Sequence, residues 1–209
     1  MAVYVIKANP ACRYLESANA TYATARAGSS VEVVDDGTLA FGQYDNSPYH
    51  CYEAFLEFDT RAVQGKVLEA KIAWFSRRTI YNLLSFRAQV RAYDYSGGEP
   101  TADDWVPGGD IDDAHYPLFA TQDGYLIQRA HNSYKTNKDC CFVTEAGAEK
   151  LIKVGGYTRF LVVTDKFVEG ESPYGAFWQS AGAMNLAEGL EPFLILYTTA
   201  PGPPMITTW

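Results

Sequence analysis

Residues 51–60, CYEAFLEFDT, constrain the fold most, because their side chains alternate in the way that a β-strand requires. One parity holds Tyr52, Ala54, Leu56 and Phe58, and the other parity holds Glu53, Phe55 and Glu57. Successive side chains of a strand point to opposite faces of the sheet. The segment therefore predicts a strand with one mostly buried face.

Other segments repeat this pattern between turn residues. We predict further strands at 2–8, 20–27, 30–34, 38–43, 67–76, 83–95, 157–165, 174–182 and 191–199. Gly28-Ser29-Ser30 ends the second of these, and Asp35-Asp36-Gly37 joins 30–34 and 38–43 as a hairpin. The strands containing 51–60, 67–76 and 83–95 are expected to form the middle of the fold.

Two segments depart from the strand pattern. Residues 96–125 are rich in Gly, Pro and Asp and predict a long loop, which is usually functional or peripheral. Residues 144–156 predict one short helix or turn, with Thr144 as its N-cap and Gly155-Gly156 as its end.

The fold class predicted from these elements is all-β: a jelly-roll-like antiparallel β-sandwich with one short helix and a Pro-rich C-terminal tail. The chain has 209 residues and 47% hydrophobic side chains, which suffices for one core. We predict a single sandwich domain over residues 1–199. Residues 200–209 contain three prolines and predict an extended tail that projects from the core or reaches a neighbour.

The charge balance argues against a nucleic-acid partner. The chain has 17 basic and 25 acidic residues, so its net charge is −8, whereas binding to phosphates needs a concentrated basic face. Arg77, Arg78, Arg87 and Arg91 form the tightest basic cluster and are interpreted as solvated positions on the outer face of a sheet.

The termini and the apolar segments predict neither export nor membrane insertion. The opening residues lack a basic segment followed by an apolar run, which argues against a signal peptide. No apolar stretch approaches the length that crosses a bilayer.

No motif for catalysis, cofactor binding or metal binding is found. Neither a GxSxG sequence nor a phosphate-cradling loop is present, so we expect a non-enzymatic protein without a cofactor. The four cysteines and three histidines lack zinc-ligand spacing. The acidic pairs Asp103-Asp104 and Asp112-Asp113 leave open glycoside cleavage or a calcium ion, although solvated loop ends are the more common use of such pairs.

The order of segments resembles the DNRLRE-type and disaggregatase-related β-sandwich modules. The resemblance covers roughly residues 20–199 and rests on a pattern of packing residues. The matching positions are Phe55, Leu56, Phe58, Asp59, Thr60, Ala70, Trp105, Thr158, Phe160, Leu161 and the segment from Pro192 to Tyr197. It implies a jelly-roll-like sandwich related in shape to carbohydrate-binding modules and used in surface, adhesion and bacteriophage virion proteins.

Two functions follow from this resemblance. The first is a virion structural protein, either a capsid decoration or a tail-surface subunit, whose partners are other virion proteins and its own copies; the missing export signal favours it. The second is a carbohydrate-binding or adhesion module. Its aromatic candidates for stacking on a glycan are Trp105, Tyr116, Tyr125 and Tyr134, and packing over the edges of the sandwich is the alternative role for these rings.

Overall fold

The computed structural model of the chain describes residues 1–45, 47–74, 76–79, 86–95, 98–123, 142–173, 180–185 and 190–199. The predicted tail at 200–209, Tyr125, Tyr134, Cys140 and Cys141 lie outside these residues. The fold class is confirmed, because antiparallel strands of two sheets pack face to face around a common core.

Within the described residues, the larger sheet contains ten strands. They are β2 (Arg13–Asn19), β3 (Val31–Val34), β4 (Thr38–Asp45), β5 (Tyr49–Asp59), β7 (Ser76–Thr79), β8 (Arg87–Ala92), β9 (Leu118–Asp123), β10 (Val143–Thr144), β11 (Tyr157–Thr164) and β12 (Ser180–Asn185). The smaller sheet contains β1 (Ala2–Lys7), β13 (Phe193–Thr198) and β6 (Val67–Ala73), in the spatial order β1-β13-β6.

Strand β5 joins the two branches of the larger sheet. Residues 49–52 pair with both β2 and β4, and residues 54–55 pair with both β2 and β11. Since a strand has only two edges, β4 and β11 must follow one another along the same edge of β5. One branch then continues through β8, β9 and β10, and the other continues through β12 and β7.

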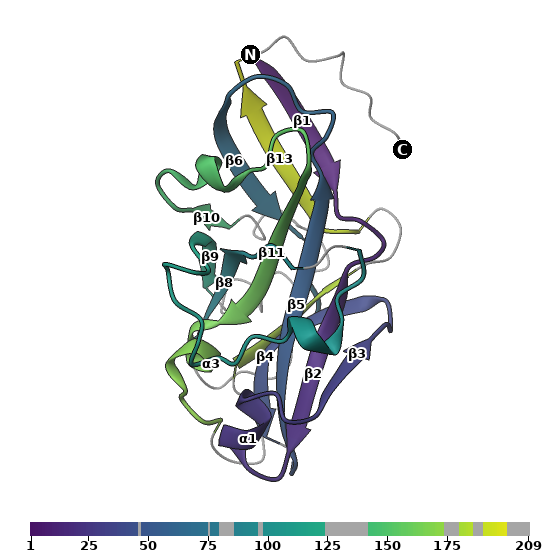
Figure 1. The fold of residues 1–209 in the computed structure, drawn as a ribbon, viewed down its shortest axis with the longest axis vertical. Helices are drawn as coiled ribbons and strands as arrows, with labels where there is room; N and C mark the ends of the chain where they lie inside the picture. Colours follow the sequence, from purple (N-terminus) through teal and green to yellow (C-terminus); the bar gives the residue numbers. More distant parts are fainter. Residues whose placement is uncertain are drawn as a thin grey trace.

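The main core lies between the two sheets. Leu56, Phe58 and Phe160 of the larger sheet belong to one buried cluster with Leu194 and Leu196 of the smaller sheet. In Figure 1 the smaller sheet occupies the upper end of an elongated molecule, beside the N-terminus.

A second core covers the opposite face of β5. Cys51 and Phe55 of β5 pack there with Phe167 of α3 (Asp165–Glu169), Ala25 of α1 (Tyr22–Arg26) and Val106 of the segment that follows β8. The prediction of one mostly buried face for this strand is therefore wrong. Both faces of β5 are buried, because two short helices and the segment between β8 and β9 lie over the face that carries its glutamates. We call this segment, residues 93–117, the long connection.

Local hydrogen bonds explain two places where the observed elements differ from the predicted ones. The predicted strand at 20–27 is a helix, α1, because the Thr21 side chain accepts a hydrogen bond from Thr24 N and caps its first turn. Residues 165–169, just beyond β11, form another short helix, α3, which Thr164 caps by accepting from Phe167 N.

The predicted helix at 144–156 is reduced to a 3₁₀ turn, η3 (Ala148–Leu151), after Gly147. Thr144 is not its cap, because this residue lies in β10 and its hydroxyl donates to Ala70 O. The predicted loop at 96–125 holds a second 3₁₀ turn, η1 (Ala102–Asp104), and ends in strand β9.

Strand pairing also corrects two predictions. The strands at 30–34 and 38–43 do not form a hairpin: β3 pairs with β2, whereas β4 pairs with β5 and β12. Strand β6 is not in the middle of the fold, because it is an edge strand of the smaller sheet. Strand β2 lies in a stretch where the sequence showed no strand signal.

Gly28 provides a test of how α1 is held against the rest of the fold. Its φ of 75° disfavours side chains, and a Cβ there would lie 2.3 Å from Trp105 Cδ1. Gly155 has a similar φ of 80°, with nothing within 4 Å of an added Cβ. We expect Gly155→Ala to cost about 1–2 kcal/mol from the left-handed backbone alone.

Gly28→Ala should carry the same backbone cost and a further steric cost of about 1–3 kcal/mol. Equilibrium unfolding in urea measures both variants against the unsubstituted protein. Equal losses for the two variants would mean that the contact between Gly28 and Trp105 is unimportant for stability.

Candidate protein-binding face

The outer face of the smaller sheet carries four apolar side chains beside the charged residues Lys7, Glu69 and Lys71. In the antiparallel register Val3 lies opposite Tyr197, and Val5 lies opposite Ile195. The alternate side chains of β1 and β13 point into the main core, so these four share the opposite face. Val5 is 55% exposed, and the other three are half-buried. We call these four residues the outer apolar face.

The charged side chains around the outer apolar face are paired. Lys7 Nζ lies 3.7 Å from a Glu191 carboxylate oxygen, and Lys71 Nζ lies 2.9 Å from Glu69. Lys71 Nζ also lies 5.4 Å from the centroid of the Tyr197 ring. The opposite charges of these ion pairs cancel locally, although the whole chain carries a net charge of −8. The face is therefore free of the repulsion that an acidic surface would impose on an acidic partner.

Sequence reasoning missed this face. The signal for it is present in AVYVIK and FLILYT, where both parities of the strand are apolar. Such two-sided strands are usually buried on both faces. Here one parity fills the core and the other reaches the surface.

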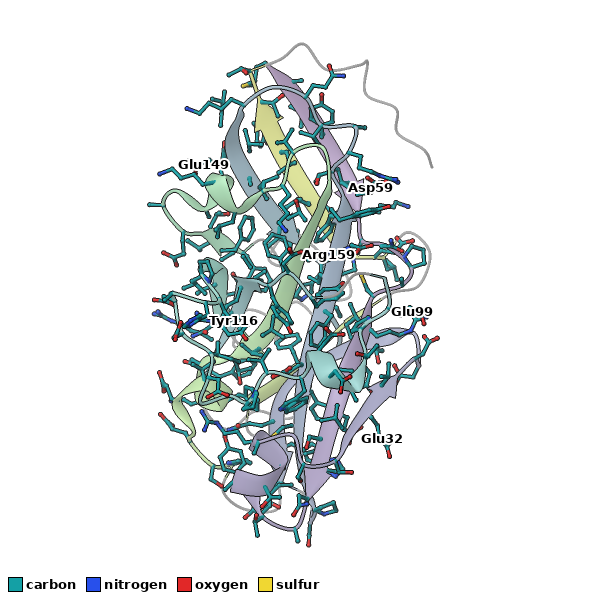
Figure 2. All side chains as sticks on the ribbon, viewed as in Figure 1. Glu32, Asp59, Glu99, Tyr116, Glu149 and Arg159 are labelled. Atoms are coloured by element: carbon teal, nitrogen blue, oxygen red, sulfur yellow. The ribbon has the colours of Figure 1, made fainter. Side chains whose placement is uncertain are left out.

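Two of the aromatic glycan candidates pack around the second core. The Trp105 ring meets Phe167 edge to face with centroids 5.9 Å apart, and Tyr116 meets Tyr93 edge to face with centroids 5.3 Å apart. Both side chains are partly buried, and Tyr116 is marked in Figure 2. This packing favours the structural role for these two rings, while glycan binding stays a prediction.

Glu53 is a carboxyl group enclosed in the second core. Its side chain is fully buried, and Oε2 accepts a hydrogen bond of 3.1 Å from Val106 N. Oε1 has no hydrogen-bond partner in the part of the chain that the structure describes. Burial raises the pKa of Glu53 well above its ordinary value, and the bond from Val106 N opposes this shift only in part. The buried environment therefore disfavours the ionised form of Glu53.

Glu57, four residues further along β5, is buried with its charge compensated. Arg159 Nε of β11 donates to Glu57 Oε2 at 2.6 Å, and Asn9 Nδ2 donates to Oε1 at 2.8 Å. Figure 2 marks Arg159 near the middle of the molecule. Neither Glu53 nor Glu57 lines the groove of about 400 Å³ between β6 and β10 or the hollow of about 180 Å³ beside Arg159.

Acidic residues of the long connection accept hydrogen bonds within turns or form ion pairs. Asp104 Oδ2 accepts from the backbone and hydroxyl of Thr101, and Asp112 accepts from the backbone of His115. Asp113 lies 2.7 Å from Arg91 Nη1. Arg91 is only 5% exposed, so the expectation that it lies on a solvated face is wrong: its guanidinium is held by Asp113 and by Tyr116 O.

Among the described residues, no group of three or more His, Cys, Asp or Glu side chains is placed to hold a metal ion. Cys12 and Cys51 are buried free thiols, and burial raises the pKa of Cys12 to about 12. None of the described helices is long and apolar enough to cross a membrane.

Comparisons with known proteins add no relative. No protein-family model matches the sequence, and no curated protein matches it with significance. The resemblance to DNRLRE-type modules accordingly stays a prediction.

The buried state of Glu53 predicts how stability depends on pH. Because its folded-state pKa is raised, the unfolded chain releases this proton at a lower pH than the folded chain. The contribution of Glu53 to the free energy of unfolding therefore falls as pH rises through that interval. Glu53→Gln removes the titration and retains an acceptor for Val106 N. Its gain in melting temperature over the unsubstituted protein should be larger at about pH 8 than at about pH 5.

Glu32→Gln is the matched control, because Glu32 is exposed on β3. We expect the control to leave the pH dependence of the melting temperature unchanged in a thermal scan. The same gain for Glu53→Gln at both pH values would contradict a raised pKa of Glu53 in the fold.

Proposed function

We propose that this chain is a non-enzymatic structural subunit that acts through protein-protein contacts, as a capsid decoration or tail-surface subunit of a virion does. The outer apolar face is the observation that carries the proposal. It places four neighbouring apolar side chains, from two adjacent strands, on the surface of a regular sheet.

The energetics of this face suit a docking surface. Fully burying a side chain of this size is worth roughly 1.5–3 kcal/mol relative to leaving it exposed. The two β-branched residues of β1 lose little side-chain entropy on contact, since their rotamers are already restricted. The ion pairs at Lys7 and Lys71 can remain at the rim of a contact, where they cost little.

The assignment to a virion rests on the resemblance of the sequence to sandwich modules that such particles use. The face supports the less specific part of the proposal, namely action through protein contacts. No contact of Trp105 or Tyr116 favours the glycan-binding alternative, because both rings already pack against side chains of the chain itself.

Particle association tests the proposal. Particles released by lysis of the source culture are purified on a density gradient after the chain has been supplied with an epitope tag. We expect the tagged chain to migrate with the particles and to be labelled on their surface by antibody. A chain found only in the particle-free fractions would reject the virion assignment.

A variant of the face makes this test specific. Ile195→Glu places a carboxylate on the outer apolar face, where it can pair with Lys71 across the strands and so keep the sheet intact. We expect it to lower the bound fraction at least about tenfold, because a charge must then be desolvated in the contact. Val33→Glu, at a 46% exposed position of β3, should bind normally. Equal binding of both variants would show that the docking surface lies elsewhere.

A further inference from the structure

A groove of about 400 Å³ lies between β6 of the smaller sheet and β10 of the larger sheet. The two strands are joined at one end, since Phe142 N donates to Ile72 O at 3.2 Å. Further along, a side chain makes the connection, because the Thr144 hydroxyl donates to Ala70 O at 2.9 Å. Beyond Ala70, no hydrogen bond between described residues joins the two strands. The groove therefore opens where the edges of the two sheets part.

Two exposed apolar side chains line this groove, one from each strand. Leu68 of β6 is 49% exposed, and Val143 of β10 is 69% exposed. Leu68 has no Cα partner on β13, because the register between the two strands shifts beside it. Single exposed apolar residues are common on protein surfaces, whereas apolar residues gathered at one hollow mark an interaction site.

The charges along the groove leave an acidic surplus. Three carboxylates line it, those of Glu69, Glu145 and Glu149, together with one cation, Lys71, which lies 2.9 Å from Glu69. Among the described residues, neither Glu145 nor Glu149 has an ion-pair partner. Lys150 does not line the groove. Because complementary potentials meet at interfaces, two uncompensated carboxylates favour a cationic occupant.

The edge of β6 offers a backbone donor to an extended chain. The carbonyl groups of Ala70 and Ile72 accept from the β10 side, so the backbone of both residues faces away from β13. The N–H of Ala70 points the same way, and no described residue accepts a hydrogen bond from it. Extended peptides bind at such edges through their main chain, and their alternate side chains enter neighbouring hollows.

We propose that this groove binds an extended segment of a partner protein in which an apolar residue is flanked by lysine or arginine. The apolar residue lies between Leu68 and Val143, and the cationic residues face Glu145 and Glu149. This inference deepens the proposed function and rests on it for its biological use, because it names the chemistry of a partner.

The groove adjoins the outer apolar face. Glu69 and Lys71 line the groove, and their Cα partners on β13 are Tyr197 and Ile195 of that face. A partner seated in the groove can therefore continue over the outer apolar face without leaving the smaller sheet. The groove volume falls within the range of roughly 300–1,000 Å³ that is usual for binding sites, which suits a few side chains of a segment.

Synthetic peptides test the chemistry of the occupant. The probe is a short fluorescein-labelled peptide that alternates lysine and valine, and fluorescence anisotropy measures its binding to the unsubstituted protein. We expect a dissociation constant below about 1 mM. A peptide that alternates lysine and serine should bind at least about tenfold more weakly, and so should one that alternates glutamate and valine. Absence of binding by the lysine–valine peptide, or equal binding of either comparison peptide, would overturn the inference.

A double variant shows whether the peptide lies at the acidic side chains of the groove. Glu145→Gln with Glu149→Gln removes the acidic surplus. The matched control is Glu32→Gln with Asp103→Asn, which removes two charges from exposed positions outside the groove. We expect the first pair to weaken binding of the lysine–valine peptide at least about fivefold and the control to leave it unchanged. Equal losses would mean attraction to the net charge alone and would overturn the inference.

A single substitution tests the apolar wall. Val143→Thr keeps a β-branched side chain and replaces a methyl group by a hydroxyl. Val33→Thr makes the same change on β3, at a position that is 46% exposed and outside the groove. We expect binding of the lysine–valine peptide to be at least about threefold weaker for Val143→Thr, and unchanged for Val33→Thr. Equal affinities of these two variants would place the peptide elsewhere and overturn the inference.

A second copy of the chain is the competing occupant, and light scattering detects it. A dimer of the unsubstituted protein that Glu145→Gln with Glu149→Gln dissociates would place a second copy in the groove and overturn the inference.

The two proposals fail separately. A chain that migrates with virions and does not bind the lysine–valine peptide supports the proposed function and rejects the groove as a docking site. Binding at the groove by a chain that is absent from virions supports the docking site and rejects the virion assignment.

Discussion

The pairing and burial of β5 organise the rest of the molecule. This strand pairs with β2 along one edge and with β4 and then β11 along the other. Its eleven residues also separate the two cores, so both of its faces are removed from water. Two carboxyl groups are buried with it: Glu57 is bonded by Arg159 and Asn9, whereas Glu53 accepts only from Val106 N among the described residues, and its burial raises its pKa.

This arrangement explains why an apolar face remains open elsewhere. The short helices and the connection after β8 cover the second core, on the side of β5 that faces away from the smaller sheet. On the outside of β1 and β13, Val5 is 55% exposed, and Val3, Ile195 and Tyr197 are half-buried. The outer apolar face therefore remains partly exposed to solvent.

Much of the strand content could be predicted from the sequence, and the reasons for the misses are physical. Residues 157–164 and 193–198 are rich in aromatic, aliphatic and β-branched side chains. The local preference of these residues for strands agrees with the fold there. At 22–26 the alternation of Thr, Ala and Tyr suggested a strand, but a single side-chain cap at Thr21 and packing of Ala25 select a helix. Capping of this kind depends on backbone geometry that alternation alone does not reveal.

By itself, the sequence determined the fold class, because strands need alternating side chains and their ends need turn residues, and both are local properties. Only the tertiary structure decided which strands pair and which faces are covered. Glu53, Phe55 and Glu57 share one parity, and nothing local states that residues as distant in the sequence as Val106 and Arg159 will bury them. Likewise, AVYVIK reads as a strand apolar on both sides, and only the placement of its neighbours leaves Val3 and Val5 at the surface. Long-range contacts settle these points because burial is a property of the assembled layers.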